Sequence, residues 1–449
     1  MDIRTAPDVR TRVDELVGKT TAAAGRPPEL WPADALGQFT AQAVLVSLEQ
    51  AYRSPFYREK FEGIAPPSSF EEFRRLPFTY PHEIKGRLRE LLACPWKDLR
   101  QINMSSGTTA GPTTYVAYAE EDLRGDGAHY APAGLFAFPP ADLVFVALPY
   151  DMATVGFSIH RDLQRQGACV LPAGKGGTYS SPERLVQAIR ELEPVTLFST
   201  PSYAWYLSEL FARTYPGARR PLEHLQVGGE GASPAMLARL GEAWGADVRQ
   251  WYGSTEIGVI AYSCERGTYH VTSANCHLEL LDDAGDPVEP GTPGRIVLTA
   301  LGRVATPFVR YACGDRGILL ADPCPCGRTL PALRMLGRTA DQIPGAQGPV
   351  SPYLVEQLLL DALPDAAPWY HIEIRDSGAV LVAEWPRKEP FSGQEAVTAA
   401  LRDRARATAG LELAAVEWAE TGSLDRPWTK MRRVRDLRSP ETVLPEAGR

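Results

Sequence analysis

The sequence predicts an α/β protein with a large N-terminal domain of parallel α/β sheets and a small β region, followed by a small α+β C-terminal domain. Its 449 residues allow two or three domains at about 150 residues each. Strand and helix patterns alternate between residues 143 and 199, which favours parallel α/β architecture. From residue 264 onward, short apolar runs punctuated by glycine and proline indicate antiparallel β structure.

Composition and charge exclude several classes of protein. Hydrophobic residues make up 44% and charged residues 23% of the chain, so global disorder is excluded. The formal charge of −8 argues against nucleic-acid and polybasic membrane partners. No run approaches the ~20 apolar residues of a membrane-spanning helix, and the acidic N-terminus is not a secretory signal. Seven cysteines fit a reducing cytoplasm better than a disulfide framework, so a cytoplasmic protein is expected.

Local patterns place the elements of the N-terminal domain. Before residue 100, helices are expected between proline-rich breaks. Residues 143–148, 168–171 and 195–199 are short apolar runs typical of buried strands. Pro182 opens an amphipathic helix between the last two runs. We expect four of its apolar residues on one face: Leu185, Val186, Ile189 and Leu192.

A domain boundary is expected near residues 337–345, where glycine and proline cluster. The C-terminal domain is then expected to contain two strands paired across a turn at residues 376–378, a helix and a further strand. These elements are expected at residues 371–374, 379–383, 395–408 and 413–418.

The most distinctive segment is residues 104–114, which is rich in hydroxyl side chains and contains two glycines. Small residues let backbone N–H groups approach an anion closely, and hydroxyls add donors, as a triphosphate requires. The segment is not a Walker loop, because no Gly-Lys-Ser/Thr follows. An ordinary polar turn is the alternative interpretation.

Two further segments carry candidate chemistry. In residues 251–258, Tyr252 can stack a base, Thr255 can donate to a phosphate and Glu256 can hold Mg²⁺ through its oxygens. The alternative is a strand end followed by a helix cap at Ser254 or Thr255. In residues 310–315, Asp315 can accept both hydroxyls of a ribose, although an aspartate in a β-turn is the commoner case.

In their order and separation, the three segments resemble the core motifs of the adenylate-forming acyl/aryl-CoA ligase superfamily. The resemblance is strongest to its phenylacetate–CoA ligase-like family. Other segments resemble that family too, at residues 76–79, 200–203, 227–231, 337–338 and 422–430. The resemblance implies an AMP-forming acid–thiol ligase that uses ATP, Mg²⁺ and, as the family default, coenzyme A. A carrier-protein thiol as acceptor remains open, as does a nucleotide-binding relative without turnover. A monomer and a homodimer both remain open.

The same resemblance implies residue roles. Catalytic roles fall to Lys430, Thr255 and the Mg²⁺ ligand Glu256. ATP contacts are implied for Ser105, Ser106, Gly107, Thr108, Thr109, Gly229, Glu230, Gly231, Trp251, Tyr252, Gly253, Ser254, Asp315 and Arg338. Contacts to the acid are implied for Tyr150, Phe157, His160, Pro201, Tyr203, Gly228 and Gly258. The aromatic side chains among these favour an aryl or arylacetic acid, with core packing as the alternative for several of them.

The resemblance also implies a division of the chain into an N-terminal adenylation core at residues 1–336, a hinge at 337–342 and a swinging C-terminal domain at 343–449. Two departures from the family pattern stand out. Residues 110–113 read Ala-Gly-Pro-Thr where the family usually has Gly-Lys-Pro-Thr, so one phosphate-facing cation is missing, and Ala340, followed by Asp341, occupies the usual hinge position.

Three thiols and one imidazole form a candidate structural zinc site: Cys264, His270, Cys324 and Cys326. Zn²⁺ takes such Cys₃His sets with tetrahedral geometry, and all four positions would then be filled by protein. Cys276 and His277 are competing ligands, and four unconnected residues are the alternative interpretation.

Overall fold

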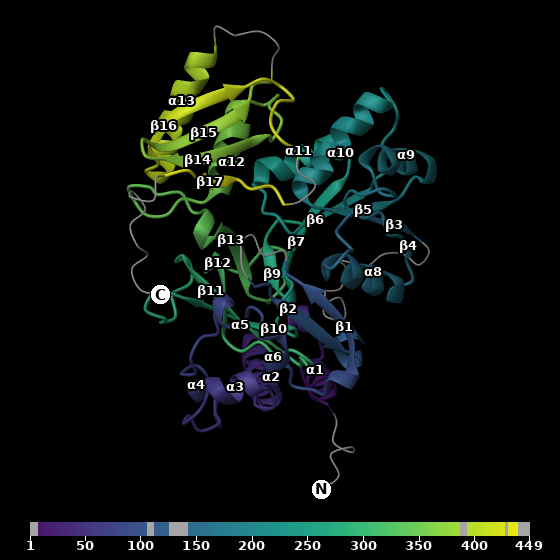
Figure 1. Ribbon diagram of the computed structural model, residues 1–449, viewed down its shortest axis with the longest axis vertical. Helices are drawn as coiled ribbons and strands as arrows, with labels where there is room; N and C mark the ends of the chain where they lie inside the picture. Colours follow the sequence, from purple (N-terminus) through teal and green to yellow (C-terminus); the bar gives the residue numbers. More distant parts are fainter. Residues whose placement is uncertain (1–7, 106–111, 125–141, 387–392, 427–429, 439–449) are drawn as a thin grey trace. The chain divides into compact units, whose positions relative to one another are not determined.

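The computed structural model describes residues 8–105, 112–124, 142–386, 393–426 and 430–438 (Figure 1). The chain divides into two compact units. The first unit contains Met1–Ser199, Pro221–Gly229 and Arg249–Met335, and the second contains Thr200–Arg220, Glu230–Val248 and Leu336–Arg449. Among the described residues, no helix is long and apolar enough to cross a membrane.

The first unit begins with helices separated by proline-rich breaks, as expected. Asp8 caps the first helix by accepting a hydrogen bond from the Thr11 backbone N–H at 2.9 Å, and Gly25 ends it with φ of 63°. The helices and the first strand pair are α1 (Val9–Ala24), α2 (Ala33–Ala51), α3 (Pro55–Lys60), α4 (Phe70–Phe73), α5 (Pro81–Ile84), α6 (Leu88–Leu91), β1 (Leu99–Met104), β2 (Tyr115–Ala119) and α7 (Glu120–Arg124).

An eleven-stranded sheet follows, in the order β10-β11-β12-β13-β9-β8-β7-β6-β5-β3-β4. Strands β3 to β6 run parallel and are linked by helices, which confirms the α/β class. The expected antiparallel strands after residue 264 continue this same sheet. The elements are β3 (Leu143–Val146), α8 (Val155–Arg165), β4 (Cys169–Leu171), α9 (Pro182–Leu192), β5 (Thr196–Ser199), α10 (Pro201–Thr214), β6 (His224–Gly228), α11 (Pro234–Trp244), β7 (Asp247–Ser254), β8 (Gly258–Ser263), β9 (Tyr269–Val271), β10 (Cys276–Leu281), β11 (Gly294–Ala300), β12 (Tyr311–Leu319) and β13 (Ala332–Arg338).

The expected helix α9 is present, and the apolar residues near its end differ in burial. Leu185, Val186 and Ile189 are buried, but Leu192 is 51% exposed. The helix ends at Leu192 because Glu193 adopts the left-handed conformation with φ of 47°.

Arg310, which directly precedes strand β12, links this strand to the segment after α4 through side-chain hydrogen bonds. Its guanidinium donates to both carboxylate oxygens of Glu279 at 3.0 and 3.1 Å and to the backbone carbonyls of Arg74 and Leu76. Both ion-pair side chains are buried. These contacts hold Arg310 at φ of 44°, an uncommon angle for a residue with a β-carbon.

The second unit contains α10 and α11 together with a four-stranded sheet of order β16-β15-β14-β17. The expected hairpin is present, with Tyr370 paired to Ala383 and Arg375 to Gly378. The expected helix and final strand are present as well. The elements are α12 (Pro352–Ala362), β14 (Tyr370–Arg375), β15 (Gly378–Glu384), α13 (Gln394–Ala409), β16 (Leu413–Ala419) and β17 (Val434–Asp436). The division at residues 337–342 stays a prediction.

Candidate active site

The motif at residues 251–258 forms the end of the β7–β8 hairpin. Trp251 pairs with Tyr262, and Ser254 pairs with Gly258. A β-carbon at Gly253 would lie 2.6 Å from the Gly258 carbonyl oxygen, so only glycine fits there. The Ser254 hydroxyl accepts a hydrogen bond from the Ile257 backbone N–H at 3.2 Å. Ser254 therefore caps a tight turn, and no helix follows it. The turn presents Thr255 and Glu256, and Glu256 is 9% exposed.

Tyr252 and Asp315 join the second and third motifs within the first unit. The Tyr252 hydroxyl donates to Asp315 Oδ2 at 2.6 Å, although β7 and β12 are separated by three strands in the sheet. The sheet must therefore curl between them, since strands lie about 4.8 Å apart. Burial, with the nearby Asp315 carboxylate, raises the pKa of Tyr252 well above its ordinary value, so the hydroxyl stays protonated and donates.

The segment expected to cradle phosphate lies only partly within the described residues. Ser106, Gly107, Thr108 and Thr109 lie outside them, as does Ala110. The flanks of the segment are held together, because the Ser105 backbone N–H donates to the Thr114 carbonyl at 2.9 Å. The Met104 N–H donates to the Met152 carbonyl at 2.8 Å, so this flank is also tied to the stretch that holds Tyr150, Phe157 and His160, which are expected to contact the acid.

Three of the residues expected to contact the acid form an aromatic cluster at the N-terminal end of α8. Tyr150 lies against Phe157 with ring centroids 5.3 Å apart, and its hydroxyl is 3.1 Å from His160 Nδ1. Burial lowers the pKa of His160 and raises that of Tyr150. Phe157 is 37% exposed, so an apolar ring edge remains accessible.

Gly228, the last residue of β6, packs against the ring of Trp251 in the neighbouring strand β7. A β-carbon at Gly228 would lie 2.2 Å from the Trp251 ring, so the glycine is required for this packing. Trp251 is 5% exposed, and its Nε1 has no hydrogen-bond partner among the described residues. Gly258 adopts φ of 92°, which favours glycine.

The second unit holds the remaining candidates: Pro201, Tyr203, Glu230, Gly231, Arg338 and Lys430. Glu230 accepts from the Ser202 hydroxyl at 2.6 Å and from the Met431 backbone N–H at 3.3 Å, so the residue after Lys430 lies beside Glu230. A β-carbon at Gly231 would overlap the Tyr353 ring. Pro201 opens α10, and Tyr203 is buried in it. Arg338 and Lys430 are exposed.

The four residues of the candidate zinc site lie together in the first unit. Their ligand atoms are all within 4.8 Å of one another. Cys264 Sγ is 3.7 Å from Cys324 Sγ, and Cys326 Sγ is 3.3 Å from His270 Nε2. The sulfur–sulfur distance excludes a disulfide and matches the edge of a tetrahedron with Zn–S bonds of about 2.3 Å, which is about 3.8 Å.

The tautomer of His270 also suits a metal. Its Nδ1 lies 3.3 Å from the Leu330 carbonyl, which can only accept, so Nδ1 carries the proton. The lone pair of Nε2 therefore faces the thiols. The competing ligands Cys276 and His277 are not part of this group of four. The Cys276 thiol donates to the Thr272 carbonyl, and the His277 ring packs against Phe70.

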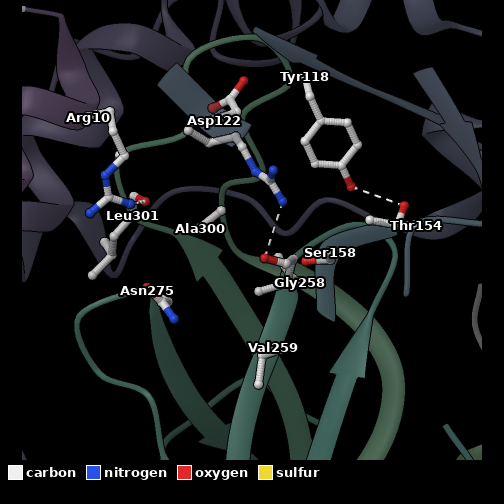
Figure 2. A pocket seen from close by; sticks show the side chains of 13 residues that line it. Arg10, Tyr118, Asp122, Thr154, Ser158, Gly258, Val259, Asn275, Ala300 and Leu301 are labelled. Atoms are coloured by element: carbon white, nitrogen blue, oxygen red, sulfur yellow. Dashed lines mark hydrogen bonds between the residues drawn. The ribbon is translucent and has the colours of Figure 1, made fainter. Parts of the chain in front are cut away.

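Sequence reasoning missed the residues behind the Thr255–Glu256 turn. The Tyr118 hydroxyl donates to the Thr255 carbonyl at 3.1 Å. Arg303 Nη2 donates to the carbonyls of Glu256 and Ile257 at 3.3 and 3.2 Å. Tyr118, Gly258 and the start of α8 line one pocket (Figure 2). No signal in the sequence singles out a strand tyrosine or a loop arginine for this position.

Comparisons with known proteins identify the family. Residues 60–302 match the AMP-binding enzyme family. The chain is 32% identical to the phenylacetate–coenzyme A ligase of Thermus thermophilus, over 77% of this chain and 80% of that protein. It is 29% identical to the phenylacetate–coenzyme A ligase of Escherichia coli, over 78% of this chain and 82% of that protein.

A solved structure shows the same fold. It is a 2-hydroxyisobutyryl-CoA ligase in the postadenylation state, in complex with R3-HIB-AMP. The matched region covers 92% of this chain and 91% of the chain of that ligase. The TM-score is 0.82 at 24% identity. From the family match and the similarity to the two ligases, we conclude that the chain belongs to the AMP-binding enzymes as a phenylacetate–CoA ligase-like acid–thiol ligase.

Proposed function

We propose that this ligase activates an aromatic carboxylic acid with ATP and then transfers the acyl group to coenzyme A. In the first step the carboxylate attacks the α-phosphorus of ATP, and pyrophosphate leaves. In the second step the thiol attacks the acyl carbonyl, a thioester forms and AMP leaves. The observation that carries the proposal is the hydrogen bond between Tyr252 and Asp315, which unites two nucleotide motifs far apart in sequence.

The proposed nucleotide contacts follow from this pairing. Asp315 would accept the ribose hydroxyls, Tyr252 would lie against the base, and Thr255 would donate to phosphate. Glu256 fits Mg²⁺, because Mg²⁺ is usually held by one or two carboxylates together with substrate phosphates. Bound there, Mg²⁺ would neutralise charge that builds on the phosphates. Lys430 is the proposed ammonium for the α-phosphate.

The aromatic cluster at α8 supports an aromatic acid. Its two rings, Tyr150 and Phe157, would pack against a flat apolar group. His160 is kept neutral by burial, so it would serve as a hydrogen-bonding group beside the acid. The relatives in Thermus thermophilus and Escherichia coli are named phenylacetate–coenzyme A ligases, which points to the arylacetic class.

We further propose that Cys264, His270, Cys324 and Cys326 hold a structural Zn²⁺. The support is the tetrahedral spacing of the ligand atoms and the proton on His270 Nδ1. All four ligands come from protein, so this ion would stabilise the sheet and would take no part in the reaction.

Exchange of labelled pyrophosphate into ATP, run over a panel of phenylacetic, benzoic and aliphatic acids, tests the proposed function. We expect exchange that depends on an aromatic acid and acyl-CoA formation when coenzyme A is added. Glu256→Gln should lower exchange by about 10²–10³-fold, because it removes charge stabilisation at the phosphates, while the melting temperature stays unchanged. Exchange without any acyl-CoA would favour a carrier-protein acceptor. Absence of exchange with every acid would favour a nucleotide-binding protein without turnover.

A further inference from the structure

Two hydrogen-bonded side chains act on the backbone at either side of Glu256. The peptide unit before Glu256 ends in the Thr255 carbonyl, which accepts from the Tyr118 hydroxyl at 3.1 Å. The peptide unit after Glu256 carries the Glu256 carbonyl, which accepts from Arg303 Nη2 at 3.3 Å. Peptide units are planar, so hydrogen bonds to both of them restrain φ and ψ of Glu256. The direction of its Cα–Cβ bond is then restrained as well.

Tyr118 and Arg303 also support each other. The Arg303 guanidinium lies over the Tyr118 ring, 4.7 Å from its centroid, a cation–π arrangement. The Tyr118 hydroxyl also lies 3.2 Å from Thr154 Oγ1, as Figure 2 shows. Because the single Tyr118 proton goes to the Thr255 carbonyl, the Thr154 hydroxyl is the donor in that contact. The Glu256 turn is therefore tied to the start of α8 through Tyr118.

The loop that carries Arg303 is itself rigidly held. The buried Asp122 carboxylate accepts from the backbone N–H groups of Val304 and Ala305 at 2.7 and 2.9 Å. The Thr306 hydroxyl bonds both backbone groups of Ala117, on the strand that also carries Tyr118. The side chains of Tyr118 and Arg303 thus come from two segments, β2 and the loop after β11, that are hydrogen-bonded to each other.

We propose that Arg303 and Tyr118 are positioning residues that hold the peptide units flanking Glu256 and so aim its carboxylate at the metal–phosphate site. The inference rests on the proposed role of Glu256 in adenylation. Neither residue needs to touch ATP, because each acts on main-chain carbonyls. A misplacement of about 1 Å in a reacting group can cost about 10²-fold in rate, which sets the expected size of the effect.

Three variants separate the contacts. Arg303→Met removes the Nη2 donor to the Glu256 and Ile257 carbonyls and keeps an unbranched apolar stem. Tyr118→Phe removes the bond to the Thr255 carbonyl and keeps the ring. Arg295→Met is the matched control, because Arg295 also donates to main-chain carbonyls, those of Asp282 and Asp283, but at a different turn.

The first readout is Mn²⁺ affinity in the presence of a non-hydrolysable ATP analogue, followed by electron paramagnetic resonance. We expect Arg303→Met to weaken Mn²⁺ binding and to lower pyrophosphate exchange by about 10–100-fold, with unchanged KM for the acid. Tyr118→Phe should also weaken Mn²⁺ binding and lower pyrophosphate exchange, but by a smaller factor. Thioester formation from supplied acyl-AMP, which needs no metal–phosphate site, should stay near wild type in both variants.

Arg303 also lines the pocket shared with α8, so direct contact with the acid is the rival account. A raised KM for the acid with unchanged Mn²⁺ affinity would overturn the positioning role in favour of that contact. Equal losses in exchange and thioester formation, together with a lowered melting temperature in both variants, would show that Arg303 and Tyr118 only stabilise the fold. That result would overturn the positioning role. Wild-type protein that binds Mn²⁺ with the analogue but shows no exchange would refute the proposed function alone. Absence of Mn²⁺ binding in wild type would refute the positioning role itself.

Discussion

At the scale of single residues, His277 shows how burial controls a titrating group. Its ring packs edge-on against Phe70 and Phe73, with centroids 5.2 and 6.1 Å away. Its Nε2 is buried without a hydrogen-bond partner among the described residues. Burial, helped by the nearby Arg74 and Arg310 charges, lowers the pKa of His277 to about 4.

This burial predicts a loss of stability in acid. The folded pKa lies below the ordinary 6.5, so the unfolded state binds the proton first. The stabilising contribution is complete above pH 6.5 and is lost as the pH falls toward 4, by about 3 kcal/mol in the free energy of unfolding. Denaturant unfolding between pH 7 and 4 measures it. His277→Gln should reduce the fall in the free energy of unfolding between pH 7 and 4. The exposed His82 provides a control, because its replacement by glutamine should leave that fall unchanged.

At the scale of secondary-structure elements, the metal candidates link the β8–β9 hairpin to the loop before β13. Cys264 follows β8, His270 lies in β9, and Cys324 and Cys326 belong to the loop. Besides backbone pairing and the four ligands, an ion pair between Arg328 and Glu265 at 2.9 Å joins these segments. A bound ion would therefore fasten the loop to the sheet.

We expect purified protein to contain about one Zn²⁺ per chain, measured by inductively coupled plasma mass spectrometry. Cys324→Ser should lose the metal and lower the melting temperature, because metal binding contributes directly to folding. Cys169→Ser is the control, since Cys169 is exposed and lies outside the group. A metal-free wild-type protein whose stability is insensitive to chelators would contradict the zinc site.

At the scale of the whole molecule, Lys430 tests whether the two half-reactions use different arrangements of the chain. An ammonium at the α-phosphate contributes about 10²–10³ in rate, and the predicted hinge at residues 337–342 would withdraw it before thiol attack. Lys430→Ala should therefore abolish acyl-AMP formation and leave acyl transfer from supplied acyl-AMP largely intact, as chromatography of both products would reveal. Arg432→Ala serves as a neighbouring-charge control. Equal losses in both steps would contradict the domain rotation, and no loss in either would mean that Lys430 is a solvated surface charge.

Much of this architecture could be predicted from the sequence because its determinants are local. Continuous apolar runs marked the parallel strands, where Val144, Phe145 and Val146 are fully buried. The turn at residues 376–378 set the β14–β15 hairpin. The exposure of Leu192 could not be predicted, because helical periodicity does not reveal where a helix ends, which here depends on the left-handed Glu193.

Only the tertiary structure decided which distant residues meet. The sequence by itself determined the family motifs and their candidate chemistry, since each is a short run of suitable side chains. It could not pair Tyr252 with Asp315, nor place Tyr118 and Arg303 behind the Glu256 turn. Those contacts depend on how the sheet curls and on which loop packs against it. Such geometry is set by the sum of many burial and hydrogen-bonding terms across the first unit, and no local pattern encodes it.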